Sequence, residues 1–105
     1  MPLPERNHRI TLAQARELTR NHRGGAPPGA GGPFRAGAFR REIIDEILAQ
    51  AGCAGLRIYL GRTATGEQTL LMTGVDSDGN DLSSGTLADD VLPCPPFCTS
   101  GGLEE

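Results

Sequence analysis

The apolar residues of this chain change their spacing at Gly52, and this change limits the folds that are open to it. Before Gly52, Phe39, Ile43 and Ile47 recur at every fourth position, which is the spacing of one face of an α-helix. After it, residues 56–60 alternate in the way that a strand does when one face is buried. A chain with both patterns can bury its apolar surface by packing helices on a sheet, so the sequence predicts an α+β fold.

Two amphipathic helices are predicted. The first covers residues 11–22, where Thr11 and Gln14 have the spacing of a capping box, in which each side chain bonds a free backbone amide at the helix start. The second covers residues 38–51, and Gly52 stands where a left-handed cap would end it. Each helix has an apolar face that can cover part of a sheet.

A short antiparallel sheet follows the helices. Residues 56–60 and 68–75 read as two strands joined by a Gly-containing turn, and residues 82–91 supply a weak third strand. We therefore expect two amphipathic helices packed on one face of a small antiparallel sheet of two or three strands. The expected core consists of the apolar residues on these faces: Leu12, Leu18, Phe39, Ile43, Ile44, Ile47, Leu48, Leu56, Ile58, Leu60, Leu70, Met72 and Val75.

The length of 105 residues predicts one compact domain, which we place at residues 1–98. Within it, residues 24–33 contain only Gly, Ala and Pro and predict a flexible linker, while residues 99–105 are expected to fray. We find neither the pattern of a signal peptide nor an apolar run of membrane-spanning length. These features predict a cytoplasmic protein without a membrane partner, in a compartment that keeps thiols reduced.

Charge is distributed unevenly along the chain. All ten Lys and Arg positions are arginine and lie in residues 1–62, whereas residues 63–105 carry eight acidic residues. The two halves could face each other in the fold, or the basic half could bind an acidic protein partner. Scattered arginines without aromatic neighbours argue against nucleic-acid binding. The absence of lysine excludes Schiff-base chemistry and a P-loop.

The segment from Cys94 to Cys98 is the most distinctive one, because two prolines and a phenylalanine separate its cysteines. A straight polyproline path would hold the two Cα atoms about 12 Å apart, so we predict a turn that brings them within about 7 Å. The sulfurs could then form a disulfide or bind zinc, with Cys53 as a third thiolate and His8 or His22 as a fourth ligand. A structural or unpaired role for the cysteines also remains open.

A calcium site is a weaker interpretation of the segment that follows the second strand. Asp76, Asp78 and Asn80 match the first three ligand positions of a calcium loop. Asp81 and Leu87 then stand where the loop needs glycine and glutamate. The pattern therefore favours a plain turn.

Three segments of the C-terminal half share a pattern with other proteins: Gly-Cys-Ala-Gly-Leu-Arg-Ile-Tyr at 52–59, Gly-Val-Asp-Ser-Asp-Gly-Asn-Asp at 74–81 and Pro-Cys-Pro-Pro-Phe-Cys at 93–98. This pattern resembles that of short bacterial proteins of unassigned function. The resemblance implies no activity. It only makes residues 76–81 and 94–98 the first candidate positions.

Taken together, these patterns favour a small non-enzymatic binding or accessory module of a bacterial cytoplasm over an enzyme. No catalytic residue, no cofactor-binding residue and no cofactor is predicted, and the oligomeric state stays open. The alternative is a thiol site for zinc binding or redox exchange, built on Cys94 and Cys98 with Cys53 as a further zinc ligand. A third hypothesis is a peptide substrate whose tail presents Cys, Ser and Thr residues to a modifying enzyme.

Overall fold

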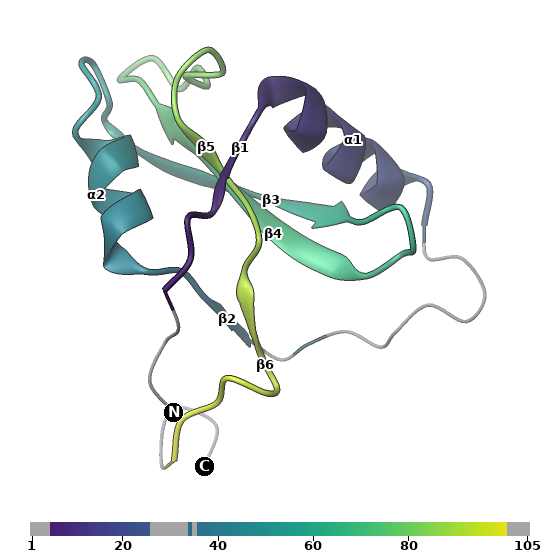
Figure 1. Cartoon of the computed structure of the whole chain (residues 1–105). Helices are drawn as coiled ribbons and strands as arrows, with labels where there is room; N and C mark the ends of the chain where they lie inside the picture. The colour runs from purple at the N-terminus through teal and green to yellow at the C-terminus, as the bar shows by residue number, and fades with distance from the viewer. Residues whose placement is uncertain (1–4, 26–33, 35, 101–105) are drawn as a thin grey trace.

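The computed structural model describes residues 5–25, 34 and 36–100, and every element named here lies within these parts. Neither helix in them is long and apolar enough to cross a membrane. Much of the predicted linker at 24–33 and of the predicted tail at 99–105 lies outside them. In chain order, the elements are β1 (Arg9–Ile10), α1 (Leu12–Arg23), β2 (Ala36–Ala38), α2 (Arg41–Leu48), β3 (Gly55–Arg62), β4 (Gln68–Val75), β5 (Leu87–Ala88) and β6 (Leu92–Cys94) (Figure 1).

The strands form two antiparallel sheets. The larger one has the order β1-β5-β4-β3, and β2 pairs with β6 in a separate two-stranded sheet (Figure 1). The α+β class and the β3–β4 hairpin are confirmed, but the predicted size of two or three strands is wrong. Four of the six strands contain only two or three residues, which is too short for an alternating pattern to appear in a sequence.

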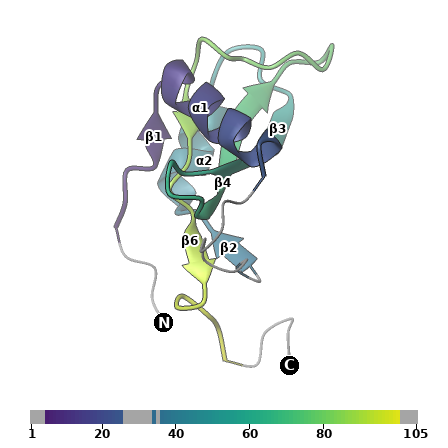
Figure 2. The same cartoon turned by 90° about the vertical axis from the view of Figure 1, so that its right-hand side faces the viewer.

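The two helices cover opposite faces of the larger sheet. Successive residues of a strand point to opposite faces, and β4 buries both Leu71 and Met72. Leu71 lies beside α1, whereas Met72 packs against Ile43 and Ile47 of α2. Seen from the side, α1 lies in front of the sheet and α2 behind it (Figure 2). The prediction that both helices share one face is therefore wrong.

The main core lies between α2 and the sheet. It contains Ile43, Ile47, Met72 and Ala88, all buried, with Phe39, Ile44, Cys53 and Leu56 packed against it. Leu71, Leu87, Val91 and Leu92 are also buried and were missing from the predicted core.

Three residues that were predicted in the core are exposed instead. The exposed fraction is 45% for Leu48, 58% for Ile58 and 49% for Leu60. The alternation of β3 assigns Ile58 and Leu60 to the α2 face, as expected, but α2 ends at Leu48 and packs only near Leu56. The apolar side of β3 therefore extends beyond the helix that should cover it.

Helix α1 begins as the sequence predicts. The Gln14 amide donates to Thr11 Oγ1 at 3.1 Å, and the Thr11 amide donates to Gln14 Oε1 at 2.9 Å, which completes the capping box. These bonds satisfy two backbone amides that would otherwise lack partners at the helix start.

Helix α2 is shorter than the predicted range 38–51. Residues Ala36–Ala38 form strand β2 with β6, so the helix begins only at Arg41. It ends with Ala49 as its cap, and Gly52 takes a φ of 78° in the turn that follows. The predicted cap glycine thus adopts a positive φ, which costs glycine little. It does so in the turn after the helix and does not itself cap the helix.

Candidate ligand-binding site between α1 and the sheet

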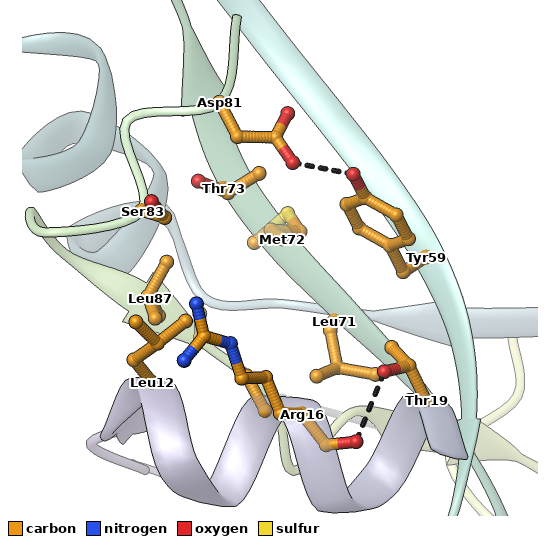
Figure 3. A pocket seen from close by; sticks show the side chains of 12 residues that line it. Leu12, Arg16, Thr19, Tyr59, Leu71, Met72, Thr73, Asp81, Ser83 and Leu87 are labelled. Carbon is orange, nitrogen blue, oxygen red and sulfur yellow. Dashed lines mark hydrogen bonds between the residues drawn. The ribbon is translucent and has the colours of Figure 1, made fainter.

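A half-open pocket of about 320 Å³ lies between α1 and the sheet (Figure 3). Its volume is at the lower end of the range of small-molecule sites, roughly 300–1,000 Å³. Leu12 of α1, Leu71 of β4 and Leu87 of β5 supply apolar surface. We call this the α1–sheet pocket. Its lining residues are Leu12, Ala15, Arg16, Thr19, Tyr59, Leu71, Met72, Thr73, Asp81, Ser83, Leu87 and Ala88.

The helix side of the pocket follows from the start of α1. Because the capping box fixes the first helical residue at Leu12, the residues Leu12, Ala15, Arg16 and Thr19 recur at three- and four-residue spacing along one face. Gly61 of β3 lets the helix lie close to the sheet at the far end. A Cβ at Gly61 would come within 3.1 Å of the Cβ of Leu18.

Tyr59 and Asp81 form one polar end of the pocket, and Arg57, which is not a lining residue, is bonded to Asp81 from outside it. Arg57 Nη1 donates to Asp81 Oδ1 at 2.6 Å, and the Tyr59 hydroxyl donates to Asp81 Oδ2 (Figure 3). The bond to Asp81, together with burial, raises the pKa of Tyr59 above its ordinary value. The phenol therefore keeps its proton near neutral pH and acts as a donor.

The loop that carries Asp81 is the predicted turn. Asp76 Oδ1 accepts hydrogen bonds from the amides of Asp78 at 3.0 Å and Asn80 at 2.9 Å. Gly79 takes a φ of 86°, which suits glycine. The loop thus satisfies the Asp76 carboxylate from within, and a bridge between Val75 and Asp81 holds its end beside β4.

Arg16 is the arginine that lines the α1–sheet pocket. Its guanidinium extends from α1 into the α1–sheet pocket (Figure 3), and it has no hydrogen-bond or ion-pair partner among the residues that the structure describes. The charge of Asp81 is already paired by Arg57, so Arg16 leaves an uncompensated positive charge at the pocket. The arginines that form ion pairs are Arg6, Arg9, Arg40, Arg41 and Arg57.

The two cysteines of the distinctive segment are joined. Cys94 and Cys98 form a disulfide with a Cα–Cα separation of 4.8 Å, which confirms the prediction that they lie within bridging distance. The Phe97 amide donates to the carbonyl of Pro93 at 2.9 Å and so closes the turn between them.

Cys53 takes no part in this disulfide. It is a free, partly buried thiol whose Sγ donates to the Gly55 carbonyl at 3.3 Å. Among the described residues, no three or more His, Cys, Asp or Glu side chains are grouped to hold a metal ion. A disulfide offers no thiolate, so zinc binding at Cys53, Cys94 and Cys98 stays a prediction about the reduced chain.

His8, a suggested fourth zinc ligand, is buried and bonded within the fold. Its Nδ1 donates to the Asp89 carbonyl at 2.9 Å, and its Nε2 accepts from the Arg40 amide at 3.4 Å. The ring therefore links the N-terminal segment to the start of α2 and to the segment after β5. His22 lies on α1 and is partly buried, and neither histidine lines the α1–sheet pocket.

The residues of the α1–sheet pocket were not predicted as a site. Arg57 and Tyr59 lie in the predicted strand 56–60, and Asp81 was considered as a mismatch to a calcium loop and as the last residue of the segment 76–81 that the resemblance singled out. The alternation of β3 could have indicated this site. Two polar side chains on one face of a strand otherwise rich in Leu and Ile can mark that face as a binding surface. Nothing in the sequence places α1 over that face.

Comparisons of the chain with protein-family models, with curated proteins and with solved structures found no match.

Proposed function

We propose that this protein is a small non-enzymatic binding module that holds a ligand with an apolar body and an acidic group in the α1–sheet pocket. One observation carries the proposal: the unpaired guanidinium of Arg16 lies beside the apolar surface of Leu12, Leu71 and Leu87. Clefts that combine apolar walls with a few placed polar groups are the usual form of a small-molecule site.

Tyr59 and Asp81, the ionisable pair at the polar end of the pocket, support binding more than catalysis, because they are already hydrogen-bonded to each other. Both carboxylate oxygens of Asp81 accept hydrogen bonds, one from Arg57 and one from Tyr59. The Thr73 hydroxyl donates to the Gly74 carbonyl at 3.2 Å. Nucleophilic catalysis requires a hydroxyl or thiol next to a base that can take its proton, and Asp81 is occupied in this arrangement.

Arg16 determines which ligand chemistry fits. A guanidinium presents donors in a planar fork that matches the two oxygens of a carboxylate. The leucine surface suits an alkyl chain or ring, and the pocket is partly open to solvent, so a ligand can enter it. The resulting ligand class is a small amphipathic carboxylate.

The test uses octanoate as the probe and the amide signals of ¹⁵N-labelled protein as the readout. We expect octanoate to shift the signals of Leu71, Thr73 and Leu87 in a saturable way, and octylamine at the same concentrations to leave them unchanged. Because a hydrogen bond to a charged group contributes about 1.5–3 kcal/mol, Arg16→Gln should weaken octanoate binding by about tenfold or more.

Arg20→Gln is the matched control, since Arg20 is exposed on the same helix and does not line this pocket. Its affinity for octanoate should equal that of the unmodified chain. Equal affinity for octylamine, unchanged binding in Arg16→Gln, or no saturable shift at the pocket would each refute the proposal.

A second candidate function is redox exchange at Cys94 and Cys98. The observation that favours it is the disulfide itself, which closes a short loop whose two prolines, Pro95 and Pro96, are exposed to solvent. The two cysteines themselves are partly buried, and an external thiolate can attack a disulfide whose sulfur is reached from solvent.

The redox candidate is tested by equilibrating the protein with glutathione buffers of graded potential, followed by alkylation and mass measurement. Exchange as a function predicts a midpoint within the range of known thiol oxidoreductases, roughly −270 to −120 mV. A midpoint below about −300 mV would identify a structural bridge instead. The same reduced protein, titrated with zinc in the presence and absence of Cys53→Ser, tests the three-thiolate zinc site.

A further inference from the structure

Exposed apolar side chains are concentrated on one strand. Within the described residues, the large hydrophobic side chains that remain exposed are Leu48, Ile58, Tyr59 and Leu60, and three of these are consecutive positions of β3. Since neighbouring residues of a strand point to opposite faces, apolar surface is exposed on both sides of the strand. A partner that covers only one face of the sheet would leave part of this surface in water.

The strand that carries these residues is an edge of the larger sheet. β3 pairs with β4 over eight residues and has no other strand partner in the described parts. The opposite edge, β1, has only two residues. Long apolar edge strands attract other strands, and proteins usually blunt them with charged side chains or Pro or by keeping them short. Residues 55–62 contain no Pro, and their two charged residues are bonded within the chain, Arg57 to Asp81 and Arg62 to the Gly66 carbonyl.

We propose that β3 pairs antiparallel with β3 of a second copy of this chain, around a twofold axis that passes beside Ile58. The pairing joins two four-stranded sheets into one continuous sheet. It satisfies the outer backbone groups of the central part of the strand, and it brings the exposed side chains of both faces against their counterparts in the second copy. The proposal does not depend on the ligand site.

The self-complementarity of β3 identifies a second copy as the partner and selects the register. Under a twofold axis perpendicular to the sheet, each face of one copy continues into the same face of the second copy. Each residue of β3 is therefore opposed by a residue from the same face. On the α2 face, Ile58 then lies opposite Ile58 of the second copy, and Leu56 lies opposite Leu60. Every directly opposed pair among these three positions is apolar.

The charges on the other face fit the same register. Arg57 lies opposite Tyr59 of the second copy, where a guanidinium can stack on the ring, and the two Arg57 side chains are not directly opposed. Each Arg57 is also neutralised within its own chain by Asp81. With Tyr59 on the axis instead, Leu56 would oppose the charged Arg62. With Arg57 on the axis, the two guanidinium groups would be directly opposed, and like charges in direct opposition destabilise a sheet. The register around Ile58 avoids both arrangements.

The first experiment measures molar mass in solution by light scattering across a concentration series. We expect a dimer of the 11.0 kDa chain that dissociates on dilution, and a monomer at all concentrations for Ile58→Lys. Because Ile58 is 58% exposed in the single chain, this variant should keep its circular dichroism spectrum. Ala13→Lys, at an exposed position of α1, is the matched control and should remain dimeric.

The second experiment tests the register by cross-linking in a Cys53→Ser background. Residues directly opposite in an antiparallel pair have Cβ atoms about 5 Å apart, so Ile58→Cys should form an intermolecular disulfide on mild oxidation. Leu60→Cys should not, because the two copies of that residue would lie about 13 Å apart along the strand. A monomeric unmodified chain, a dimer that survives Ile58→Lys, or cross-linking of Leu60→Cys in place of Ile58→Cys would overturn the proposal.

Discussion

Arg9 of β1 and Glu46 of α2 are joined by two hydrogen bonds on the α2 face of the sheet. Arg9 Nε donates to Glu46 Oε2 at 2.8 Å, and Arg9 Nη2 donates to Glu46 Oε1. The Thr86 hydroxyl also donates to Glu46 Oε2, at 3.0 Å. One carboxylate thus connects β1, α2 and the residue that precedes β5, and the strands β1 and β5 contain only two residues each.

The stability of the protein should depend on this carboxylate in acid. The hydrogen bond from Arg9, followed by that from Thr86, lowers the pKa of Glu46 from 4.5 to about 2. Because the folded pKa is the lower one, the stabilisation is complete above the unfolded value and is lost as the pH falls from about 5 to about 2. Glu46→Gln should therefore lower the urea midpoint at pH 7 and have little effect near pH 2.

Glu17→Gln removes the same charge from an exposed position of α1 and is the control for that experiment. Its urea midpoint should follow that of the unmodified chain at each pH. If the Glu46→Gln difference were the same at pH 7 and pH 2, Glu46 would not be the group whose ionisation stabilises the fold.

Ile47 is the residue on which packing of α2 depends most. Its side chain is fully buried, with 0% exposure, in the cluster that also contains Met72 and Ala88. Truncation to alanine leaves a cavity, and we expect Ile47→Ala to lower the free energy of unfolding by about 2–5 kcal/mol. The neighbouring change Leu48→Ala should cost less than about 1 kcal/mol because Leu48 is 45% exposed. Urea unfolding of both variants measures the contrast. Similar losses of stability in the two variants would show that the buried face of α2 is assigned wrongly.

The sequence carried one overlooked signal about the layers of the fold. Leu70, Leu71 and Met72 are consecutive apolar residues within β4. A strand covered on one face alternates apolar and polar residues, whereas a strand covered on both faces has a continuous apolar run. This run indicates that the sheet lies between two layers, which is how α1 and α2 are arranged. The alternation of residues 56–60 indicates the opposite, a sheet covered on one face only. It does so because β3 is an edge strand with a partly open face.

Other features could not be found in the sequence. A strand of two residues such as β1 or β5 has no period, and these two elements exist because tertiary contacts align them, including the bond between His8 and the Asp89 carbonyl. The α1–sheet pocket likewise has Arg16 and Asp81 among its lining residues, and these two positions are far apart in the chain. In contrast, the proximity of the cysteines at 94 and 98 was predictable, since both ends of that turn belong to one short segment.

Gly61 fixes the distance between α1 and β3. A Cβ at this position would lie 2.5 Å from Leu71 Cδ1 and 3.2 Å from the backbone oxygen of Leu18. The leucine tip can move, but the helix backbone must shift as a unit, so Gly61→Ala should lower the free energy of unfolding by about 1–3 kcal/mol. Gly55→Ala, at the other end of the same strand, would meet its nearest neighbour at 3.7 Å and should be neutral or slightly stabilising. Thermal unfolding of the pair gives the comparison, and equal midpoints would show that α1 is not held at this contact.

Tyr59 offers a direct measurement of the polar end of the pocket. It is the single tyrosine of a chain without tryptophan, so phenolate absorbance reports this residue alone. The hydrogen bond to Asp81, with burial as a second cause, raises the pKa of Tyr59 above 10.0. We therefore expect an alkaline titration midpoint above the usual value near 10, with circular dichroism recorded in parallel to show that the chain stays folded.

Two variants should move that midpoint in opposite directions. Asp81→Asn removes the carboxylate that opposes a negative phenolate, so the pKa of Tyr59 should fall toward its ordinary value. Arg57→Gln removes a positive charge that lowers the pKa of Tyr59, so the midpoint should rise further. If the substitutions only loosened the pocket, the titration midpoint of Tyr59 would shift in the same direction in both variants, toward the pKa of a solvated phenol. Opposite shifts therefore require that Asp81 and Arg57 contact Tyr59 in solution as they do in the fold, and a common shift would exclude that arrangement.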